Sequence, residues 1–259
     1  STDASLVVAE GASLQNQGSI TAADGEGKIF VGGTLTNAPA VTGTSPVAAG
    51  TIKATAVEVD GVLSTALDTA SATTKVYDVA QTTINTAGEL QTSLNAILDP
   101  TNATATTPKN ALEIANTINL EGKITAAGAE VPNYIVNATG GAFTIKEADK
   151  TFNTVQVKAG EFKTDDADVT LSVLDVKDAG TAKVNGGTLN VTTLKTAAAA
   201  NTVTVEDGTL ATSLTGLGLK YDATGVANAG AADTVAAGSI VLNSGSLFDV
   251  DLGSVAEVS

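Results

Sequence analysis

Several residue types that most catalytic sites use are missing from this 259-residue chain. It contains no Cys, His, Met or Trp, and all 13 of its basic residues are Lys. Without His or Cys, the chain cannot form a Ser-His-Asp or Cys-His nucleophile system, and it lacks the usual ligands of zinc, haem and iron–sulfur clusters. We therefore expect that the protein is not an enzyme.

The charge of the chain argues against polyanionic partners. The absence of Arg removes the bidentate fork that recognises phosphate and guanine, and a formal net charge of -15 repels nucleic acids. No stretch of about 18 apolar residues occurs, so the sequence predicts no membrane-spanning helix. We expect neither nucleic-acid binding nor membrane insertion.

Aromatic residues are scarce, at 3% of the chain, whereas hydrophobic residues reach 43%. The core must therefore consist of small and β-branched side chains, packed in thin and regular layers. The chain begins at Ser1 without a Met or a signal-like apolar run, as a mature secreted protein would. The absence of disulfides does not oppose export, and we expect an extracellular location at the cell surface.

A loose repeat runs along the chain. Gly187-Thr188-Leu189 recurs as Gly208-Thr209-Leu210, 21 positions later. The general pattern is one or two Val or Ile residues, one or two polar residues, a Gly, any residue, and then Leu or Phe. The seven closing residues of this pattern are Leu14, Leu35, Leu63, Phe162, Leu189, Leu210 and Leu247. Each unit predicts a strand, a Gly corner and a second short strand.

Two β architectures explain this repeat. Asn-Gly and Asp-Gly corners favour two-residue hairpins, which would build an antiparallel β-sandwich. A period of twenty-odd residues instead favours a β-solenoid (parallel β-helix), in which each coil adds about 4.8 Å. We favour the solenoid, with about ten coils in a rod of about 50 Å, and predict that the seven closing residues point inward and stack on one wall.

Residues 84–122 break the repeat and carry helix signals. Thr86 and Glu89 form a capping box, and an apolar stripe follows before Asp99-Pro100. A second segment has Thr107 as N-cap and Pro108 at the first helical position. The stripe residues of the two segments are Leu90, Leu94, Ile97, Leu98, Leu112, Ala115 and Ile118. The sequence thus predicts an N-terminal β region (1–83), an inserted helical hairpin (84–122) and a C-terminal β-repeat region (123–259) within one β body.

Two segments resemble known surface proteins. "GASLQNQGSITAADGEGKIFVGGTLTN" (11–37) and "GGTLNVTTLKTAAAANTVTVEDGTL" (186–210) are similar to the passenger regions of autotransporter and haemagglutinin-type adhesins, and to Thr/Ala-rich bacterial surface-layer (S-layer) proteins. The chain lacks calcium nonapeptides and a cell-wall sorting signal. The resemblance implies extracellular structural or adhesive work, and it carries over no catalytic residue.

Clusters of acidic residues are the remaining candidate sites. Their spacing would let carboxylates share a hard cation, for which calcium is the natural candidate. Acidic turns that are simply solvated would show the same sequence pattern. The same acids could form a glycosidase pair, but three Tyr and no Arg argue against a sugar enzyme. The predicted calcium ligands are Asp165, Asp166 and Asp168 in one cluster and Asp249 and Asp251 in another, and Asp24 and Glu26 form a third acidic pair.

The sequence therefore favours a secreted, self-assembling structural protein. We expect a subunit of a surface layer or filament whose main partner is another copy of itself, joined end to end by β contacts. The segments "SLVVAEGASL" and "GSIVLNSGSLFDVDLGSVAEVS" carry apolar alternation without Pro or a Lys gatekeeper, as strand edges open to pairing would. The alternative is an adhesin passenger that binds a cell-surface or carbohydrate receptor.

Overall fold

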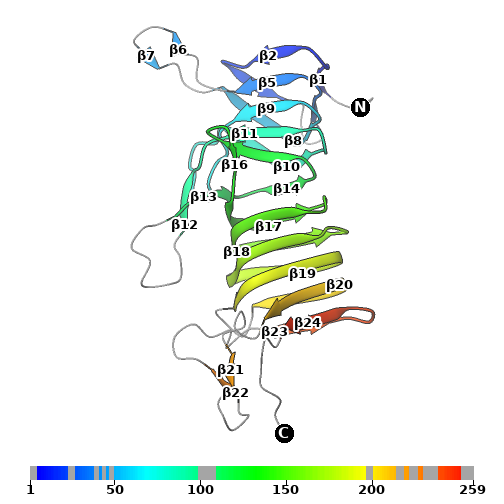
Figure 1. The fold of residues 1–259 in the computed structure, drawn as a ribbon. Helices are drawn as coiled ribbons and strands as arrows, with labels where there is room; N and C mark the ends of the chain where they lie inside the picture. The colour runs from blue at the N-terminus through cyan, green and yellow to red at the C-terminus, as the bar shows by residue number, and fades with distance from the viewer. Residues whose placement is uncertain are drawn as a thin grey trace.

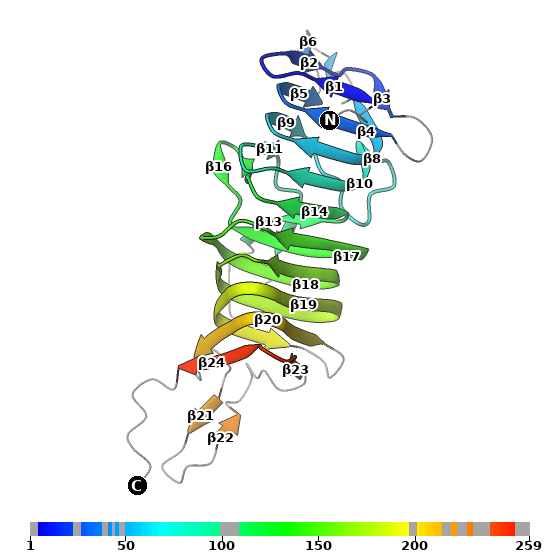
Figure 2. The same ribbon diagram turned by 90° about the vertical axis from the view of Figure 1, so that its right-hand side faces the viewer.

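The computed structural model describes residues 5–22, 27–37, 41–42, 45–46, 50–98, 109–196, 201–213, 219–221, 227–229 and 239–251. These residues form a mainly β structure, and none of them lies in a helix. Most strands stack one above another along a single column that runs from β1 to β24, whereas the β6–β7 and β21–β22 pairs lie outside this stack (Figure 1). The view turned by 90° shows the same order on a second side of the column (Figure 2).

The largest sheet has 14 strands. Its continuous path consists of β1 (Leu6–Val8), β4 (Lys28–Val31), β8 (Thr51–Val59), β10 (Tyr77–Ile84), β14 (Thr117–Leu120), β17 (Asn133–Ile145), β18 (Lys150–Asp165), β19 (Val169–Thr196), β20 (Thr202–Ser213) and β23 (Ser239–Leu242). Attached to this path are β3 (Ser19–Thr21), β12 (Ala96–Leu98), β13 (Lys109–Ile114) and β24 (Leu247–Asp251). All pairings in the sheet are parallel except that of β12 with β13.

A second sheet has six strands and forms another side of the N-terminal half. It contains β2 (Ser13–Gln15), β5 (Thr34–Asn37), β9 (Val62–Thr65), β11 (Glu89–Thr92), β15 (Lys123–Ala126) and β16 (Ala129–Glu130). Five of these strands pair in parallel, and β16 is antiparallel to β15. The remaining described strands form two small antiparallel pairs: β6 (Val41–Thr42) with β7 (Ser45–Pro46), and β21 (Leu219–Tyr221) with β22 (Ala227–Ala229).

Parallel pairing stacks equivalent residues of successive coils into columns. We call the strands of the continuous path, from β1 to β23, the first wall. One inward column of this wall has ten rungs: Leu6, Ile29, Val57, Thr82, Ile118, Phe143, Phe162, Ala182, Val203 and Ile240. At about 4.8 Å per step, its nine steps span about 43 Å. The fold is therefore solenoid-like, as predicted, with the expected number of about ten coils.

A second inward column runs beside the first, two residues further along each strand. Its ten members are Val8, Val31, Val59, Ile84, Leu120, Ile145, Thr164, Val184, Val205 and Leu242. The side chains in rungs one to nine of this column are buried, from Val8 to Val205. Because small and β-branched side chains repeat at a constant position, the core is one thin apolar layer that runs along the whole column.

Close stacking of the corners explains the recurrent glycines. A Cβ on Gly61 would lie 2.1 Å from the carbonyl oxygen of Gly33, one coil earlier, and a Cβ on Gly88 would lie 2.1 Å from that of Val59. A larger residue would push the coils apart at these corners. Buried amides bridge another corner, where the Asn16 side chain donates to Asn37 Oδ1 (2.7 Å) and Asn37 donates to Thr65 Oγ1 (3.1 Å).

The alternative architecture, an antiparallel sandwich, is wrong, because the long strands pair in parallel with the strand of the next coil. The predicted helical hairpin at 84–122 is also wrong where the structure describes that segment. Its residues form β11, β12, β13 and β14 instead. Leu90 stacks between Leu63 and Ile124, and these contacts with the neighbouring coils override the local helix signals. Asp99, Pro100, Thr107 and Pro108 lie outside the described residues.

The prediction that seven closing residues point inward holds in most cases. Five of them are fully buried: Leu35, Leu63, Phe162, Leu189 and Leu210. Leu14 is partly buried against the core, whereas Leu247 is 55% exposed and the prediction for it is wrong. Phe248 takes the expected place, because it pairs with Leu210. The residues also do not form one ladder, since Phe162 belongs to the first wall and Leu35 to the second sheet.

Candidate functional site

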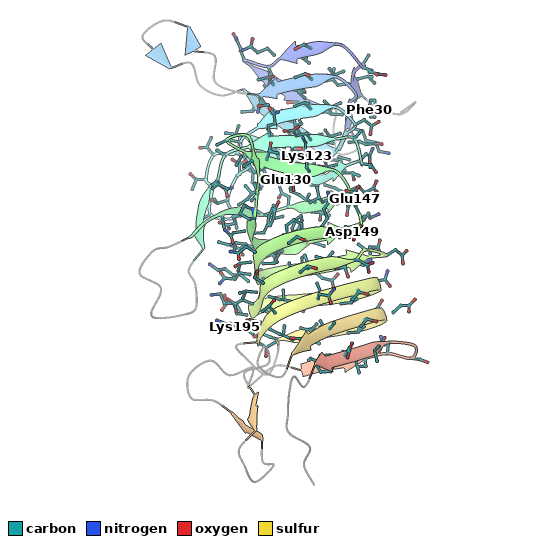
Figure 3. All side chains as sticks on the ribbon, in the orientation of Figure 1. Phe30, Lys123, Glu130, Glu147, Asp149 and Lys195 are labelled. Atoms are coloured by element: carbon teal, nitrogen blue, oxygen red, sulfur yellow. The ribbon has the colours of Figure 1, made fainter. Side chains whose placement is uncertain are left out.

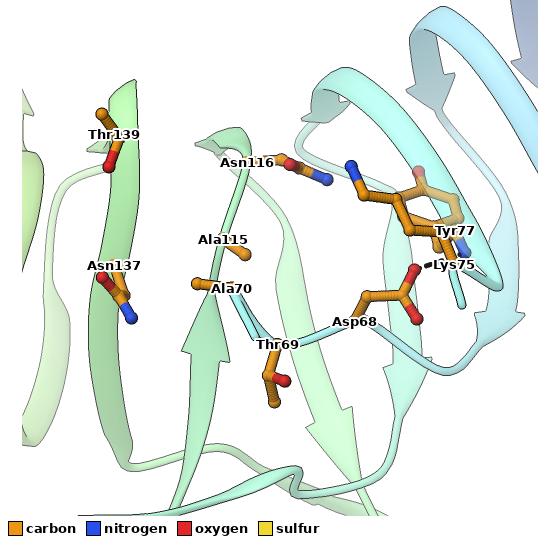
Figure 4. Close-up of a pocket in the computed structure, with 9 residues that line it drawn as sticks. All are labelled: Asp68, Thr69, Ala70, Lys75, Tyr77, Ala115, Asn116, Asn137 and Thr139. Atoms are coloured by element: carbon orange, nitrogen blue, oxygen red, sulfur yellow. Dashed lines mark hydrogen bonds between the residues drawn. The ribbon is translucent and has the colours of Figure 1, made fainter. Parts of the chain in front are cut away.

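A pocket of about 190 Å³ opens in the flank of the column (Figure 4). On one side the start of β10 pairs with β8, but β14 pairs only with the second half of β10, from Gln81 onward. No described strand therefore covers the other edge at Tyr77. The pocket occupies this gap in the wall and is lined by Asp68, Thr69, Ala70, Lys75, Tyr77, Ala115, Asn116, Asn137 and Thr139.

Most charges of this pocket already have partners. The Asp68 carboxylate accepts hydrogen bonds from the backbone N–H groups of Val76 (2.9 Å) and Tyr77 (2.8 Å). Lys75 forms an ion pair with Asp78 at 3.0 Å. The Asn137 amide donates to Glu113 Oε1 at 2.8 Å. Asp68 thus fixes the loop that leads into β10, and its role here is structural.

The Tyr77 hydroxyl takes no part in these contacts. It lies 2.8 Å from the Thr82 hydroxyl, and both side chains are buried. Burial raises the pKa of Tyr77 well above its usual value, so the phenol stays neutral. The pocket can offer hydrogen bonds from Asn116 and Thr139, but it does not bring a nucleophile and a general base together.

The acidic cluster at 165–168 is built into the wall. Asp165 accepts a hydrogen bond from the Asn185 amide (2.6 Å) and pairs with Lys163 (3.0 Å), while Lys146 lies 3.9 Å away. The hydrogen bond from Asn185, and then the one from Lys163, hold the pKa of Asp165 below its usual value. Because two ammonium groups already flank this carboxylate, a divalent cation would be repelled from it.

The other predicted ligands have surroundings of their own. Asp166 is exposed, at a corner with a φ of 53°, and Asp168 accepts a hydrogen bond from the backbone N–H of Thr188 at 2.7 Å. Asp249 lies exposed on β24, and Asp251 ends the same strand. Within the part of the chain that the structure describes, no three acidic side chains gather where they could hold a metal ion. Asp24 and Glu26 lie outside that part, and calcium binding stays a prediction.

The outward face of the first wall changes character along its length. One outward column consists of Val7, Phe30, Glu58, Thr83, Asn119, Thr144, Lys163, Lys183, Thr204 and Val241. Eight residues follow Phe30 in this column, and all of them are polar or charged except the last, Val241. Figure 3 shows Phe30 near the N-terminal end of the column of strands. The column is apolar only at its two ends.

Exposed large hydrophobic side chains are found at the same two ends, one in the first coil and three in the last. Among the described residues, the large hydrophobic side chains with high exposure are Val7 (49%), Leu94 (40%), Val241 (41%), Leu242 (47%) and Leu247 (55%). Four of these five lie in β1, β23 and β24, in the first and last coils. Leu242 occupies an inward column, yet it is half exposed because no described strand pairs with the other edge of β23.

The terminal coils are therefore the strongest candidate interaction site. Sequence reasoning found the apolar alternation near both ends, but it missed the relation between Val7 and Val241, which only the register reveals. In the described part of the chain there is no helix long and apolar enough to cross a membrane. Comparison of the chain with protein-family models, curated proteins and solved structures finds no match in any of the three.

Proposed function

We propose that this chain is a β-solenoid subunit of an extracellular surface layer or filament, which assembles by end-to-end contact of its terminal coils. The observation that carries the proposal is the gathering of exposed hydrophobic side chains in the first and last coils. Three of these side chains, Val241, Leu242 and Leu247, lie in the last coil, and Val7 lies in the first. An apolar group on a strand edge without a partner favours association.

The backbone of the terminal strands supports the same proposal. β1 and β23 stand at the two ends of the first wall, so each has one edge without a strand partner among the described residues. The N–H and C=O groups of such an edge are a template for another strand, and main-chain hydrogen bonds would supply affinity while the side chains supply register.

The flank between the ends suits a structural role. Its outward columns carry Lys, Glu, Asn and Thr, as in the ion pair of Lys183 with Glu206 at 2.7 Å. The resemblance to adhesin passengers and S-layer proteins agrees with an extracellular location. With a net charge of -15, copies that pack together repel one another, and we propose that calcium reduces this repulsion.

A dilution series of the purified chain, followed by light scattering and electron microscopy, tests the proposed function. A lattice or filament subunit polymerises without any other component, and its mean particle mass falls on dilution. An adhesin passenger stays monomeric at all concentrations until a receptor is added. Monomers throughout the series would therefore reject self-assembly in favour of the adhesin alternative.

A further inference from the structure

We infer that the last coil of one subunit stacks in register on the first coil of the next, with β23 pairing in parallel with β1. This inference rests on the proposed function and assigns the contact residues. Val241 of one copy lies beside Val7 of the next copy, Ile240 beside Leu6, and Leu242 beside Val8. The occupant of each apolar end is thus a second copy of this chain.

The columns of the first wall carry this register. Within one chain, Leu6, Val7 and Val8 pair with the next coil as one block, and Ile240, Val241 and Leu242 pair with the preceding coil as the equivalent block. Placing β23 against β1 extends both inward columns without a gap. The junction also buries the half-exposed Leu242 under the side chain of Val8.

The outward face changes in the same way. In the stacked arrangement Val241, Val7 and Phe30 become three successive rungs of one outward column. Val7 is 49% exposed and Val241 is 41% exposed in the single chain. The two apolar ends of an otherwise polar column thus join into one continuous apolar strip across the junction. Burial of apolar side chains along this strip favours association.

The corners of the two coils match as well. Val8 is followed by Leu14 six residues later, and Leu242 is followed by Phe248 six residues later, with Gly11 and Gly245 in equivalent positions. Both glycines have positive φ, 74° and 92°. The same turn hydrogen bond closes each corner, from Ala12 N to Ala9 O (3.0 Å) and from Ser246 N to Asn243 O (3.1 Å).

Equal corners let the contact continue onto the next side of the column. With β23 on β1, β24 falls opposite β2, and Phe248 lies above Leu14, which is only partly buried in the single chain. The charges agree with this placement. Glu10 falls opposite Ser244 and Asp249 opposite Gln15, so no two carboxylates meet directly.

The symmetry of this contact sets the form of the assembly. Different surfaces of the two copies meet at the junction, so the contact is heterologous. When the subunits share one axis, such a contact repeats along that axis and does not close into a ring. The inferred product is a linear filament in which each subunit adds ten rungs, or about 48 Å, to a continuous parallel sheet.

Cysteine pairs test the register directly, because the chain has no native Cys. In the double variant Val7→Cys/Val241→Cys, parallel strands about 4.8 Å apart bring the two Cα atoms within disulfide range. Within one chain the two positions lie about 43 Å apart, so a disulfide can form only between copies. The matched control is Val7→Cys/Ser239→Cys, whose second position lies two residues away on β23 and about 8 Å from Val7 in the inferred register.

We expect mild oxidation to convert assembled Val7→Cys/Val241→Cys protein into a ladder of covalent oligomers on denaturing gels, at least fivefold more than the control pair, and reductant to abolish it. Stronger cross-linking of the control pair would overturn the register. Polymers seen by electron microscopy without cross-links in either variant would overturn this contact and leave the proposed function standing. Absence of polymers from the unmodified chain would reject both. Circular dichroism of each variant checks that the fold is retained.

Discussion

The Tyr77 and Thr82 hydroxyls lie 2.8 Å apart inside the column, where neither side chain reaches solvent. Thr82 occupies a rung of the first inward column, between Val57 and Ile118. A polar residue is tolerated in this apolar position because the neighbouring Tyr77 supplies a hydrogen-bond partner. Thr164 offers the contrast: it lies between Ile145 and Val184 in the second inward column, and its buried hydroxyl has no hydrogen-bond partner among the described residues.

The same substitution at these two threonines should therefore have opposite effects. Thr164→Val removes an unsatisfied hydroxyl without changing the shape of the side chain, and we expect the free energy of unfolding to rise by about 1–2 kcal/mol. Thr82→Val leaves the Tyr77 hydroxyl buried without this partner, and we expect a loss of about 1–3 kcal/mol. Urea denaturation midpoints measure both, and a shift of the same sign in the two variants would contradict the assigned hydrogen bonding.

The burial of Leu90 and Leu94 distinguishes the observed strand from the helix that the sequence predicts for the same segment. The two residues share one stripe of the predicted helix, but in the structure Leu90 is fully buried and Leu94 is 40% exposed. We expect Leu90→Ala to cost about 2–5 kcal/mol and Leu94→Ala less than about 0.5 kcal/mol. Equal costs at the two positions, measured by urea denaturation, would fit a helical stripe instead of a strand.

The error at this segment shows what local patterns leave undecided. Thr86 and Glu89 satisfy a capping-box pattern, and the spacing of Leu90 and Leu94 satisfies a helical period. The partners that decide the outcome, Leu63 and Ile124, lie 27 and 34 residues away in sequence. A residue that fills one rung between two existing rungs gains more from burial than from helix propensity. The repeat itself could have signalled this, since Gly88-Glu89-Leu90 is a Gly-x-Leu corner.

The terminal coil was only partly predictable for a related reason. The Gly-x-Leu pattern indicates that Leu247 faces inward, but the corner after Leu242 is one residue longer than the corner after Val205, and Phe248 takes the inward place. Because side chains alternate between faces along a strand, one extra corner residue turns Leu247 outward. Inward positions of well-matched coils are thus readable from the sequence, whereas corner length and the pairing of the two ends require the register.

Removal of residues 1–10 tests the role of the first coil in assembly. The truncation deletes β1 with Leu6, Val7 and Val8, and it leaves the nine remaining rungs of the first wall in place. We expect polymers to be lost in electron microscopy while the β-sheet circular dichroism stays nearly unchanged. If the truncated chain assembles as the full chain does, the first coil is not the connector.

Calcium should strengthen the assembly. The chain carries 28 acidic residues against 13 Lys, and packing copies together brings like charges close. We expect millimolar calcium, compared with chelator, to raise both the melting temperature and the particle size. The combined variant Asp249→Asn/Asp251→Asn should reduce this response. No change in either quantity between chelator and calcium would mean that the acidic clusters are only solvated turns.

Asp165 should stabilise the fold through Lys163 and Asn185, and not through calcium. The hydrogen bond from Asn185 (2.6 Å) and the ion pair with Lys163 (3.0 Å) hold the pKa of this carboxyl below its ordinary value of 3.8. A lowered pKa in the folded state means that the charged form stabilises the fold. This stabilisation is fully present above pH 3.8 and is lost as the pH falls through the lower folded-state pKa.

Asp165→Asn should therefore lower the free energy of unfolding near pH 7 and have little effect near pH 2. The side chain is 26% exposed, so solvent screening limits the expected loss at pH 7 to about 0.5–1 kcal/mol. A double-mutant cycle with Asn185→Ala isolates the first of the two contacts, and its coupling energy should fall over the same pH range. Urea denaturation at a series of pH values measures both quantities. A loss that is equal at pH 2 and pH 7 would show that Asp165 acts through the shape of its side chain and not through its charge.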